Sequence, residues 1–190
     1  MNKYKYFYIS LFIITLDQLI KILVHFNMPL NSEISIIEDF FKLHHLENPG
    51  MAFGVDLNYK YGKLLLTSFR LIASFIIGSY LFSLIIQKAN KLLLLSISMI
   101  LAGAIGNVID SIFYGIIFNN APQNSPFSLF NGQVIDMFYI DIWEGFISSK
   151  IPFIGGSYIS LWPVFNIADA SIFIAVLIII IFHKRFSNNL

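Results

Sequence analysis

The stretch LLLLSISMILAGAIGNVIDSIFY, residues Leu92–Tyr114, contains a single charged side chain, that of Asp110. A helix needs about 20 consecutive apolar residues to cross the hydrocarbon core of a bilayer, so this stretch predicts a transmembrane helix. Backbone groups in lipid must find hydrogen-bond partners within their own segment, which excludes isolated strands here. The expected fold is an α-helical integral membrane protein with four transmembrane helices, because three further runs of similar length occur, at about 6–26, 64–86 and 164–182.

The composition agrees with a single membrane domain covering residues 1–190. Of the 190 residues, 57% are hydrophobic and 12% are charged, whereas about a quarter of the residues are charged in soluble domains. A net charge of +1 without basic clusters excludes nucleic acid as a partner. The chain has no cysteine, which excludes disulfides, thiolate metal sites and a cysteine nucleophile.

The first apolar run also has the outline of a secretory signal peptide, because Lys3 and Lys5 precede it. Asp17 and Lys21 lie inside the run, however, and no cleavage site of the small-x-small type follows it. We therefore interpret residues 6–26 as a retained first span.

Positive charges predict the orientation of the spans, because lysine and arginine concentrate in cytoplasmic segments. The N-terminal segment, the link between the second and third spans and the C-terminal segment contain no acidic residue and hold six basic ones: Lys3, Lys5, Lys88, Lys91, Lys184 and Arg185. Both termini should lie in the cytoplasm, and the segments 27–63 and 115–163 should face outward.

The outer segments carry signals for ordered structure. Residues 33–46 mix apolar and polar side chains as short surface strands do. The sequence Asn48-Pro49-Gly50 predicts a turn before a short apolar piece at 52–55. Residues 119–132 are rich in Asn, Pro and Ser, which predicts an exposed loop. We expect a further loop or helix segment at about 144–160.

Charged side chains also lie within the predicted spans, where each is costly unless it faces protein or water. Asp17 and Lys21 are four residues apart and share one helical face, where they can form an ion pair or contact lipid headgroups. Arg70, near the start of the second span, is interpreted as a snorkelling or phosphate-binding side chain without a catalytic role.

The third span places small and polar residues together. Gly103, Asn107 and Asp110 share roughly one face. Ala102 and Gly106 allow the close approach of a second helix. This pattern fits a helix-packing motif and the wall of a site equally well.

The fourth span opens with Asn166 and Asp169, which are three residues apart and should share one helical face. The next basic residue is His183, so the carboxyl group of Asp169 has no partner within its own helix. An unpaired carboxylate in a span indicates a functional site. The alternative is a buried, protonated Asp169 hydrogen-bonded to Asn107 or to a backbone carbonyl.

One further carboxyl group, that of Asp136, follows the third span in an apolar setting. The chain can return Asp136 to the outer end of the fourth span, beside Asp169. Two carboxyl groups that share one proton can activate a water molecule and protonate a departing amine. The pair can therefore hydrolyse a peptide bond without a nucleophilic side chain or a metal.

No other hydrolytic constellation competes well in the sequence. His44 and His45 are adjacent and would point to opposite faces of a strand. His25 and His183 belong to opposite ends of the predicted bundle. Neither G-x-S-x-G nor H-E-x-x-H occurs. We therefore expect no metal and no cofactor.

Five motifs in order, spread over nearly the whole chain, make the sequence resemble bacterial lipoprotein signal peptidase (signal peptidase II). Each motif alone is weak, whereas five in order are specific. The motifs are Asp17-Gln18-x-x-Lys21, Glu47-Asn48-Pro49-Gly50-Met51-Ala52-Phe53-Gly54, Gly103-Ala104-Ile105-Gly106-Asn107-x-x-Asp110, Val134-Ile135-Asp136-Met137-Phe138 and Phe165-Asn166-Ile167-Ala168-Asp169.

The resemblance implies an intramembrane aspartic endopeptidase of the bacterial inner membrane, with its active site toward the outer leaflet and a small outer β-cradle. It implies cleavage of diacylglyceryl-modified prolipoproteins just before the lipidated cysteine, with Asp136 and Asp169 as the catalytic pair. Lipidated signal peptides and membrane phospholipid are the implied partners, and we expect a monomer. Supporting or substrate-contacting roles fall to Asn48, Gly50, Asn107, Asp110, Asn166, Asp17 and Lys21.

Two features depart from the family pattern. Most members carry arginine directly after the third motif's aspartate, whereas this chain has Ser111. Asp110 therefore lacks its expected partner, and Arg70 is a candidate replacement. The stretch between Asp110 and Asp136 is also long, so residues 119–132 must fold away from the site.

Two other functions are open from the residues alone. Asp17, Asp110 and Asp169 are compatible with a proton relay in a small carrier, although the repeated halves and broken helices typical of such folds are not evident. A structural scaffold would leave the clustered carboxyl groups unexplained.

Overall fold

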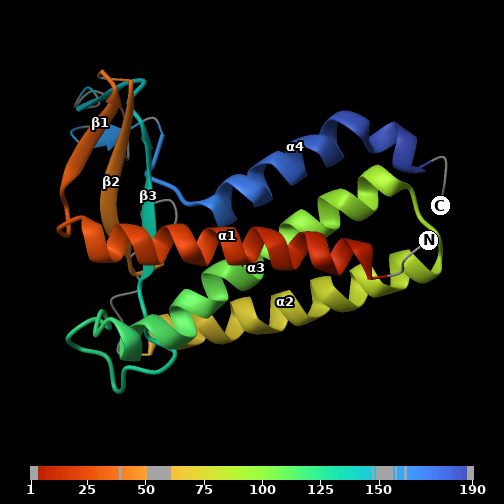
Figure 1. Ribbon diagram of the computed structural model, residues 1–190, viewed down its shortest axis with the longest axis horizontal. Coiled ribbons are helices and arrows are strands. Elements are labelled where there is room, and N and C mark those ends of the chain that lie inside the picture. Colours follow the sequence, from red (N-terminus) through yellow and green to blue (C-terminus); the bar gives the residue numbers. More distant parts are fainter. Residues whose placement is uncertain are drawn as a thin grey trace.

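The computed structural model describes residues 4–38, 40–50, 61–146, 148, 156, 158–160 and 162–187. In this part of the chain, four long helices form one bundle and short strands gather at one end of it (Figure 1). The helices are α1 (Lys5–Asn27), α2 (Gly62–Ile86), α3 (Lys91–Ile117) and α4 (Ile167–Ser187). The strands are β1 (Glu33–Ile37), β2 (Phe41–Asn48), β3 (Val134–Ile140), β4 (Glu144–Phe146) and β5 (Tyr158–Ser160).

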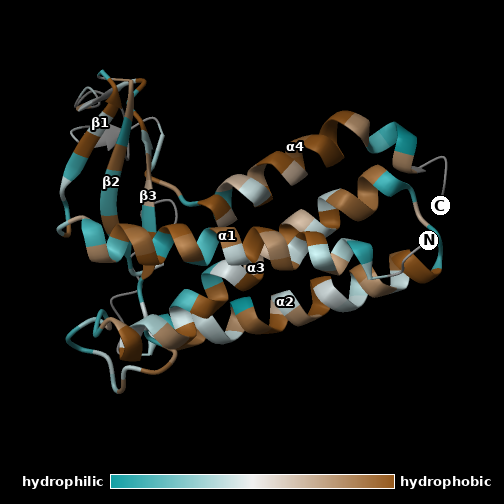
Figure 2. Ribbon diagram, in the orientation of Figure 1, coloured by the Kyte–Doolittle hydropathy of each residue, from teal (hydrophilic) through white to brown (hydrophobic). Residues whose placement is uncertain are grey.

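All four helices are long and apolar enough to cross a membrane, so the four predicted spans are confirmed. Figure 2 shows that hydrophobic residues dominate the bundle along its length. Three boundaries differ from the prediction by three residues or more: α3 continues to Ile117, beyond the expected end at 114, and α4 begins at Ile167 in place of 164 and ends at Ser187 in place of 182. The later start of α4 has a physical cause, because Phe165 pairs with β3 in an extended conformation.

Helix α3 is the central helix of the bundle. Residues buried inside the protein make up 61% of its most apolar window, against 22% or less in the other three helices. It packs against each of α1, α2 and α4, whereas those helices expose large apolar side chains such as Phe12, Phe75 and Ile181. The other helices therefore shield α3 from lipid, which lets α3 carry the polar residues Asn107 and Asp110.

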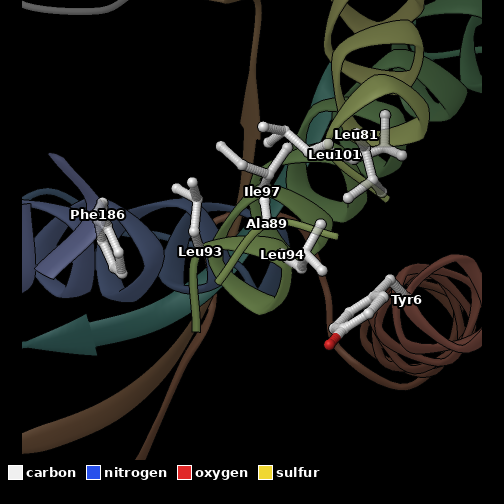
Figure 3. Packing of buried hydrophobic residues seen from close by; sticks show 9 residues of the cluster. Tyr6, Leu81, Ala89, Leu93, Leu94, Ile97, Leu101 and Phe186 are labelled. Atoms are coloured by element: carbon white, nitrogen blue, oxygen red, sulfur yellow. The ribbon is translucent and has the colours of Figure 1, made fainter. Parts of the chain in front are cut away.

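Two apolar clusters hold the bundle together at its two ends. The cluster near the two chain termini joins all four helices and is shown in Figure 3: Tyr6, Leu81, Leu84, Ala89, Leu93, Leu94, Ile97, Leu101 and Phe186. The second cluster lies against the sheet and combines Val24, Met28, Tyr114, Ile135 and Met137. The buried charged residues Asp17 and Lys21 of α1 and Asp110 of α3 lie along their helices between these clusters.

Glycines let α3 approach its neighbours closely, as predicted for Gly106, and Gly103 does so as well. A Cβ on Gly103 would collide with the carbonyl oxygen of Ala168 at the start of α4. A Cβ on Gly106 would lie 2.9 Å from Asp17 Oδ2 on α1. The two glycines of the third motif therefore serve the packing of three helices around one point.

The outer strands form two small antiparallel sheets. Strands β1, β2 and β3 pair in that order, which confirms the strands predicted around 33–46. Strand β2 runs beside β3 with Leu46 opposite Asp136. Strands β4 and β5 pair with each other, so 144–146 and 158–160 are strands and not the expected loop or helix, and most of the residues between them lie outside the described part of the chain. The predicted apolar piece at 52–55 lies outside the described residues.

The loop 119–132 is attached more firmly than its composition predicts. The backbone N–H of Phe130 donates to the carbonyl of Ile112 at 3.0 Å, near the end of α3. Asn120 and Asn131 are buried. The expectation of an exposed loop is therefore wrong near both of its ends, where the chain is buried and bonds back to α3.

Gly103→Ala should destabilise the protein by about 1–3 kcal/mol, because the added methyl group meets backbone and forces α3 away from α4. Gly78→Ala on α2 is the matched control, since a Cβ there lies at an ordinary 3.7 Å from Leu101. Alanine favours a helix over glycine by about 0.5–1 kcal/mol, so the control should be neutral or stabilising. Thermal unfolding in detergent micelles measures both variants. An unchanged midpoint for Gly103→Ala would contradict the close packing assigned to this glycine.

Candidate active site

Asp136 lies in the middle of β3, where alternation separates its side chain from those of its neighbours. Ile135 and Met137 are fully buried in the apolar cluster against the sheet. Asp136 points to the opposite face, toward the start of α4, and only 1% of its surface is exposed. Its carboxyl group is therefore almost completely removed from water.

Backbone hydrogen bonds fix β3 against the segment that precedes α4. The N–H of Phe138 donates to the carbonyl of Phe165 at 2.8 Å, and the N–H of Phe165 donates back to the carbonyl of Phe138 at 3.0 Å. Asp136 lies two residues from this bridge on one side, and Asn166 lies one residue from it on the other. The predicted return of Asp136 to the start of the fourth helix is thus present.

Asn166 is the N-terminal cap of α4. Its Oδ1 accepts the backbone N–H of Asp169 at 2.9 Å, and Asp169 Oδ2 accepts the backbone N–H of Asn166 at 3.4 Å. This reciprocal pair is a capping box, here with aspartate at the third helical position. The prediction that Asn166 and Asp169 share one helical face is therefore wrong, because the helix begins only at Ile167.

Amide side chains link the two carboxyl groups. Asn166 Nδ2 donates to Asp136 Oδ1 at 2.7 Å, and Asn107 Nδ2 donates to Asp169 Oδ1 at 2.8 Å. Asn166 Nδ2 also lies 3.2 Å from Asn107 Oδ1, which connects the two amides. The second oxygen of Asp136 accepts from Asn48 Nδ2 at 3.1 Å. Five residues expected at the site from the sequence thus form one hydrogen-bonded cluster.

The turn after β2 orients Asn48. Gly50 has a φ of +99°, a conformation that favours glycine. Its N–H donates to Asn48 Oδ1 at 2.8 Å. With Oδ1 engaged by the turn, the amide nitrogen of Asn48 is directed to Asp136. A Cβ at Gly50 would also collide with Leu66 on α2.

A buried ion triad lies beside this cluster. Lys21 Nζ lies 2.8 Å from Asp17 Oδ2 and 2.6 Å from Asp110 Oδ2, and all three side chains are fully buried. The predicted contact between Asp17 and Lys21 is present, with Asp110 as its third member. Lys21 also donates to Asn107 Oδ1 at 3.1 Å, which leaves Asn107 Nδ2 for Asp169.

The triad joins three helices. Asp17 Oδ1 accepts the backbone N–H of Ala168 at 2.9 Å, one of the N–H groups that a helix leaves free in its first turn. Gln18 Nε2 donates to Asp110 Oδ1 at 2.8 Å, and the hydroxyl of Tyr114 donates to Gln18 Oε1 at 3.0 Å. The first motif of the sequence therefore holds α1, α3 and α4 in register.

Arg70 faces protein at the site. Its Nη1 donates to Ser111 Oγ on α3 at 3.4 Å, and its Nη2 lies 3.8 Å from the position that a Cβ would occupy on Gly50. The interpretation of Arg70 as a snorkelling or lipid-phosphate side chain is therefore corrected. Arg70 is also not the main partner of Asp110, which pairs with Lys21. From α2, it brings a guanidinium group to position 111, where most members of the resembling family carry arginine.

Lys63 is a neighbour of the site that the sequence analysis missed. It is buried, and its Nζ has no hydrogen-bond partner among the described residues. The same atom lies 3.5 Å from the position that a Cβ would occupy on Gly50. A signal was available, because Lys63, Thr67, Arg70 and Ser74 follow each other at helical spacing along α2.

The environment of Asp136 controls its proton affinity. Burial raises the pKa of Asp136 to about 7, and the neighbouring charge of Asp169 acts in the same direction. Hydrogen bonds from Asn48 and Asn166 act in the opposite direction. The carboxyl group therefore exchanges its proton near neutral pH, where an acid–base catalyst is most effective.

Comparisons with known proteins find relatives along nearly the whole chain. The family model described as "Signal peptidase (SPase) II" matches residues 9–185. The "Lipoprotein signal peptidase" of Amoebophilus asiaticus is 44% identical over 181 residues, which cover 94% of this chain and 77% of that protein. The protein of the same name from Porphyromonas gingivalis is 38% identical over 184 residues, covering 91% of this chain and 80% of the relative.

The fold has solved counterparts as well. A structure described as a bacterial membrane enzyme, solved by the in meso method, aligns with a TM-score of 0.65 at 25% identity. The alignment covers 97% of this chain and 90% of the other. A second structure with the same description aligns with a TM-score of 0.61 at 26% identity, covering 93% of this chain and 90% of that one.

Lys21→Met should destabilise the protein by about 3–5 kcal/mol, because it leaves two buried carboxylates without a counter-charge. Lys42→Met is the matched control. Lys42 pairs with Asp141 at 2.8 Å with 19% and 22% of the two side chains exposed, and such pairs contribute about 0–1 kcal/mol. The free energies of unfolding in micelles are to be compared, and similar losses in the two variants would refute a structural role for the triad.

Asp136→Asn should make stability less dependent on pH. A carboxyl group with a pKa of about 7 in the folded protein and about 3.9 when unfolded binds its proton more tightly when folded. Its cost to folding therefore grows as the pH rises from about 4 to about 7 and is constant above that. The difference in unfolding midpoint, variant minus native protein, should therefore increase over this range. A constant difference caused by altered hydrogen bonds does not change this trend.

The control for this pH series is Asp141→Asn, which changes a partly exposed carboxylate. Its midpoint relative to the native protein should not rise between pH 5 and 8. A flat difference for Asp136→Asn over the same range would contradict the raised pKa of Asp136.

Proposed function

We propose that Asp136 and Asp169 are the carboxyl groups with which this chain hydrolyses its substrate, because the chain belongs to the signal peptidase (SPase) II family. The chain is a multi-pass membrane peptidase of the aspartic class and removes signal peptides from prolipoproteins. One observation carries the assignment of the pair: Asn166 donates to Asp136 at 2.7 Å and, through its Oδ1, holds the backbone of Asp169 at 2.9 Å.

Hydrolysis begins with one carboxyl group protonated and the other ionised. We assign the proton to Asp136, because burial raises its pKa, and the role of general base to Asp169. A water molecule gives a proton to Asp169 while its oxygen attacks the scissile carbonyl carbon. Asp136 gives its proton to the carbonyl oxygen, so the tetrahedral intermediate carries two hydroxyl groups and no charge.

Collapse of the intermediate returns the protons. Asp169 passes its proton to the amide nitrogen, the carbon–nitrogen bond breaks, and Asp136 takes a proton back from one hydroxyl. The products are a signal peptide with a new carboxyl group and a mature protein with a free amine. Asn107 and Asn166 act as positioning residues, because their amides hold the two carboxyl groups in place through the cycle.

The location of the pair suits a substrate that stays in the membrane. Asp136 belongs to the sheet and Asp169 to the first turn of α4, so the site lies where the bundle meets the sheet (Figure 1). We place this end at the outer leaflet of the bacterial inner membrane, with both termini in the cytoplasm. The support is that the start of α1, the link between α2 and α3 and the end of α4 lie at the other end of the bundle, and that five of the six basic residues of the predicted cytoplasmic segments belong to these parts: Lys5, Lys88, Lys91, Lys184 and Arg185.

A diacylglyceryl-modified precursor fits this arrangement. Its signal helix enters between the spans from the side, and its acyl chains remain in lipid. The bond before the lipidated cysteine then reaches the pair at the level of the lipid headgroups, where water is available. Phospholipid contacts the exposed apolar side chains of α1, α2 and α4.

A monomer is the proposed active form. One chain supplies both carboxyl groups, the two amides that bridge them and the Asn48 amide that contacts Asp136. No residue of a second copy is required to complete this cluster.

A proton carrier that uses Asp17, Asp110 and Asp169 as a relay is the competing class of function. Lys21 lies 2.8 and 2.6 Å from Asp17 and Asp110 inside the bundle. These two carboxylates are therefore members of a fixed ion triad and are poorly placed to exchange protons with solvent. The triad and the family assignment both favour the peptidase.

Asp136→Asn and Asp169→Asn should each lower cleavage of a diacylglyceryl-modified precursor by at least about 100-fold, because each removes one half of the acid–base pair. The double variant should lose little more than the weaker single variant, since the two groups act as a unit. The band shift of the precursor on a gel measures cleavage.

Asp141→Asn is the control for this assay, because Asp141 pairs with Lys42 away from the proposed site, and it should retain activity. Unfolding midpoints show whether each variant is folded. A folded single variant with native activity at either Asp136 or Asp169 would refute the pair.

A further inference from the structure

A second cluster of ionisable side chains lies where the outer end of α1 meets β2. His25, in the last turns of α1, and His45 and Glu47 of β2 each contribute one potential ligand atom, and these atoms lie within 4.8 Å of one another. His45 and Glu47 are two residues apart on the strand, whereas Asn48, which contacts Asp136, follows Glu47 directly. None of the three side chains has a part in the proposed hydrolysis.

The two neighbouring histidines of β2 diverge, as the sequence analysis expects. His44 Nδ1 lies 3.3 Å from Glu33 on β1. His45 instead turns toward α1, where its ring meets the ring of His25 edge-on at 5.9 Å between centroids. The adjacency of His44 and His45 in the sequence gives no sign of this partner from α1.

The hydrogen bonding of His45 defines its tautomer. Nδ1 lies 2.8 Å from the carbonyl oxygen of Met28, and a carbonyl oxygen only accepts, so Nδ1 carries the hydrogen. In the neutral ring the lone pair is then on Nε2. Histidines that bind metals are held in this way, with one ring nitrogen donating to a carbonyl and the other facing the ion.

Two ring nitrogens of the cluster are buried without a partner. His45 is 2% exposed, and His45 Nε2 and His25 Nδ1 have no hydrogen-bond partner among the described residues. Buried polar atoms in folded proteins are rarely left unpaired, so each such atom calls for an explanation. A ligand between the two rings and the carboxylate of Glu47 would account for both.

The rings are also held in place before any ligand arrives. The ring of His25 stacks on that of Phe118, with centroids 3.9 Å apart and planes 23° apart. The ring of His45 is fixed by its bond to Met28.

We propose that His25, His45 and Glu47 bind one divalent transition-metal ion of the Zn²⁺ class. Two imidazoles and one carboxylate form a ligand set that Zn²⁺ takes with its fourth position open to water, with bonds of about 2.0–2.2 Å. The ligand atoms must therefore draw together by about 1 Å from their present limit of 4.8 Å. This site departs from the sequence-based expectation of no metal.

The ion adds a link between α1 and β2 to the hydrogen bond that His45 makes with the carbonyl of Met28. It joins the end of α1 to β2 one residue before Asn48, and thereby fixes the strand that contacts Asp136. The role is structural, and no step of the hydrolysis passes through the metal. The proposal therefore stands or falls independently of the proposed function.

The test uses the full chain, purified in detergent without a polyhistidine tag, stripped with a chelator and titrated with ZnCl₂ in a calorimeter. We expect one Zn²⁺ per chain and a higher unfolding midpoint with the metal. Titration with Co²⁺ should produce the visible absorption bands of a low-coordinate site. His45→Gln and Glu47→Gln should each weaken binding at least about tenfold, since even indirect contacts to a bound metal contribute that much.

His44→Gln is the matched control, because this neighbouring histidine faces Glu33 on β1 and should leave the affinity unchanged. If His45→Gln fails to fold, Glu47→Gln and His25→Gln decide the question, because both residues are only half-buried. Absence of stoichiometric binding by the native protein would overturn the proposal and leave a water molecule as the bridge. Equal losses in His44→Gln and Glu47→Gln would also overturn it, since they would indicate unspecific binding at the surface.

Discussion

The bundle and its site depend on the ion pairs of one buried lysine, Lys21. Lys21 reaches two carboxylates from different helices, Asp17 and Asp110, and it also donates to Asn107. Removing three charges from water is costly, and the cost is met only where every charge has close partners. The requirement fixes α1 against α3, and through Asp17 and the N–H of Ala168 it fixes α4 as well.

The same network reaches the proposed chemistry through an amide. Lys21 engages the oxygen of Asn107, so the nitrogen of that side chain must turn to Asp169. Asn166 plays the corresponding part for Asp136, with its oxygen engaged in the helix cap and its nitrogen turned to the carboxylate. Each carboxyl group is thus oriented by an amide whose other end is already occupied. The site is organised by the fold before a substrate arrives.

Hydropathy and charge order predict the four spans, because lipid excludes nearly every alternative for long apolar runs. The order of the spans only allows Asp136 to return toward Asp169, and the resemblance to a known family singles out that pair. The sequence does not reveal that Asn166 caps α4, since a capping box and a pair within a helix have the same three-residue spacing. The positions of Arg70 and Lys63 beside the site were not predictable for another reason. A basic residue near the end of an apolar run fits snorkelling into headgroups and burial in protein alike, and only the packing of α2 on α3 decides between them.

The i,i+4 spacing of Asp17 and Lys21 has a consequence for how the protein is made. Helix α1 leaves the ribosome before α3, so it enters the bilayer before Asp110 exists. A lone charge would resist that passage, but two opposite charges on one face of the same helix compensate each other within it. The first helix can therefore be inserted as a locally neutral segment, and the arrival of α3 completes in the membrane an ion cluster whose first half was assembled during translation.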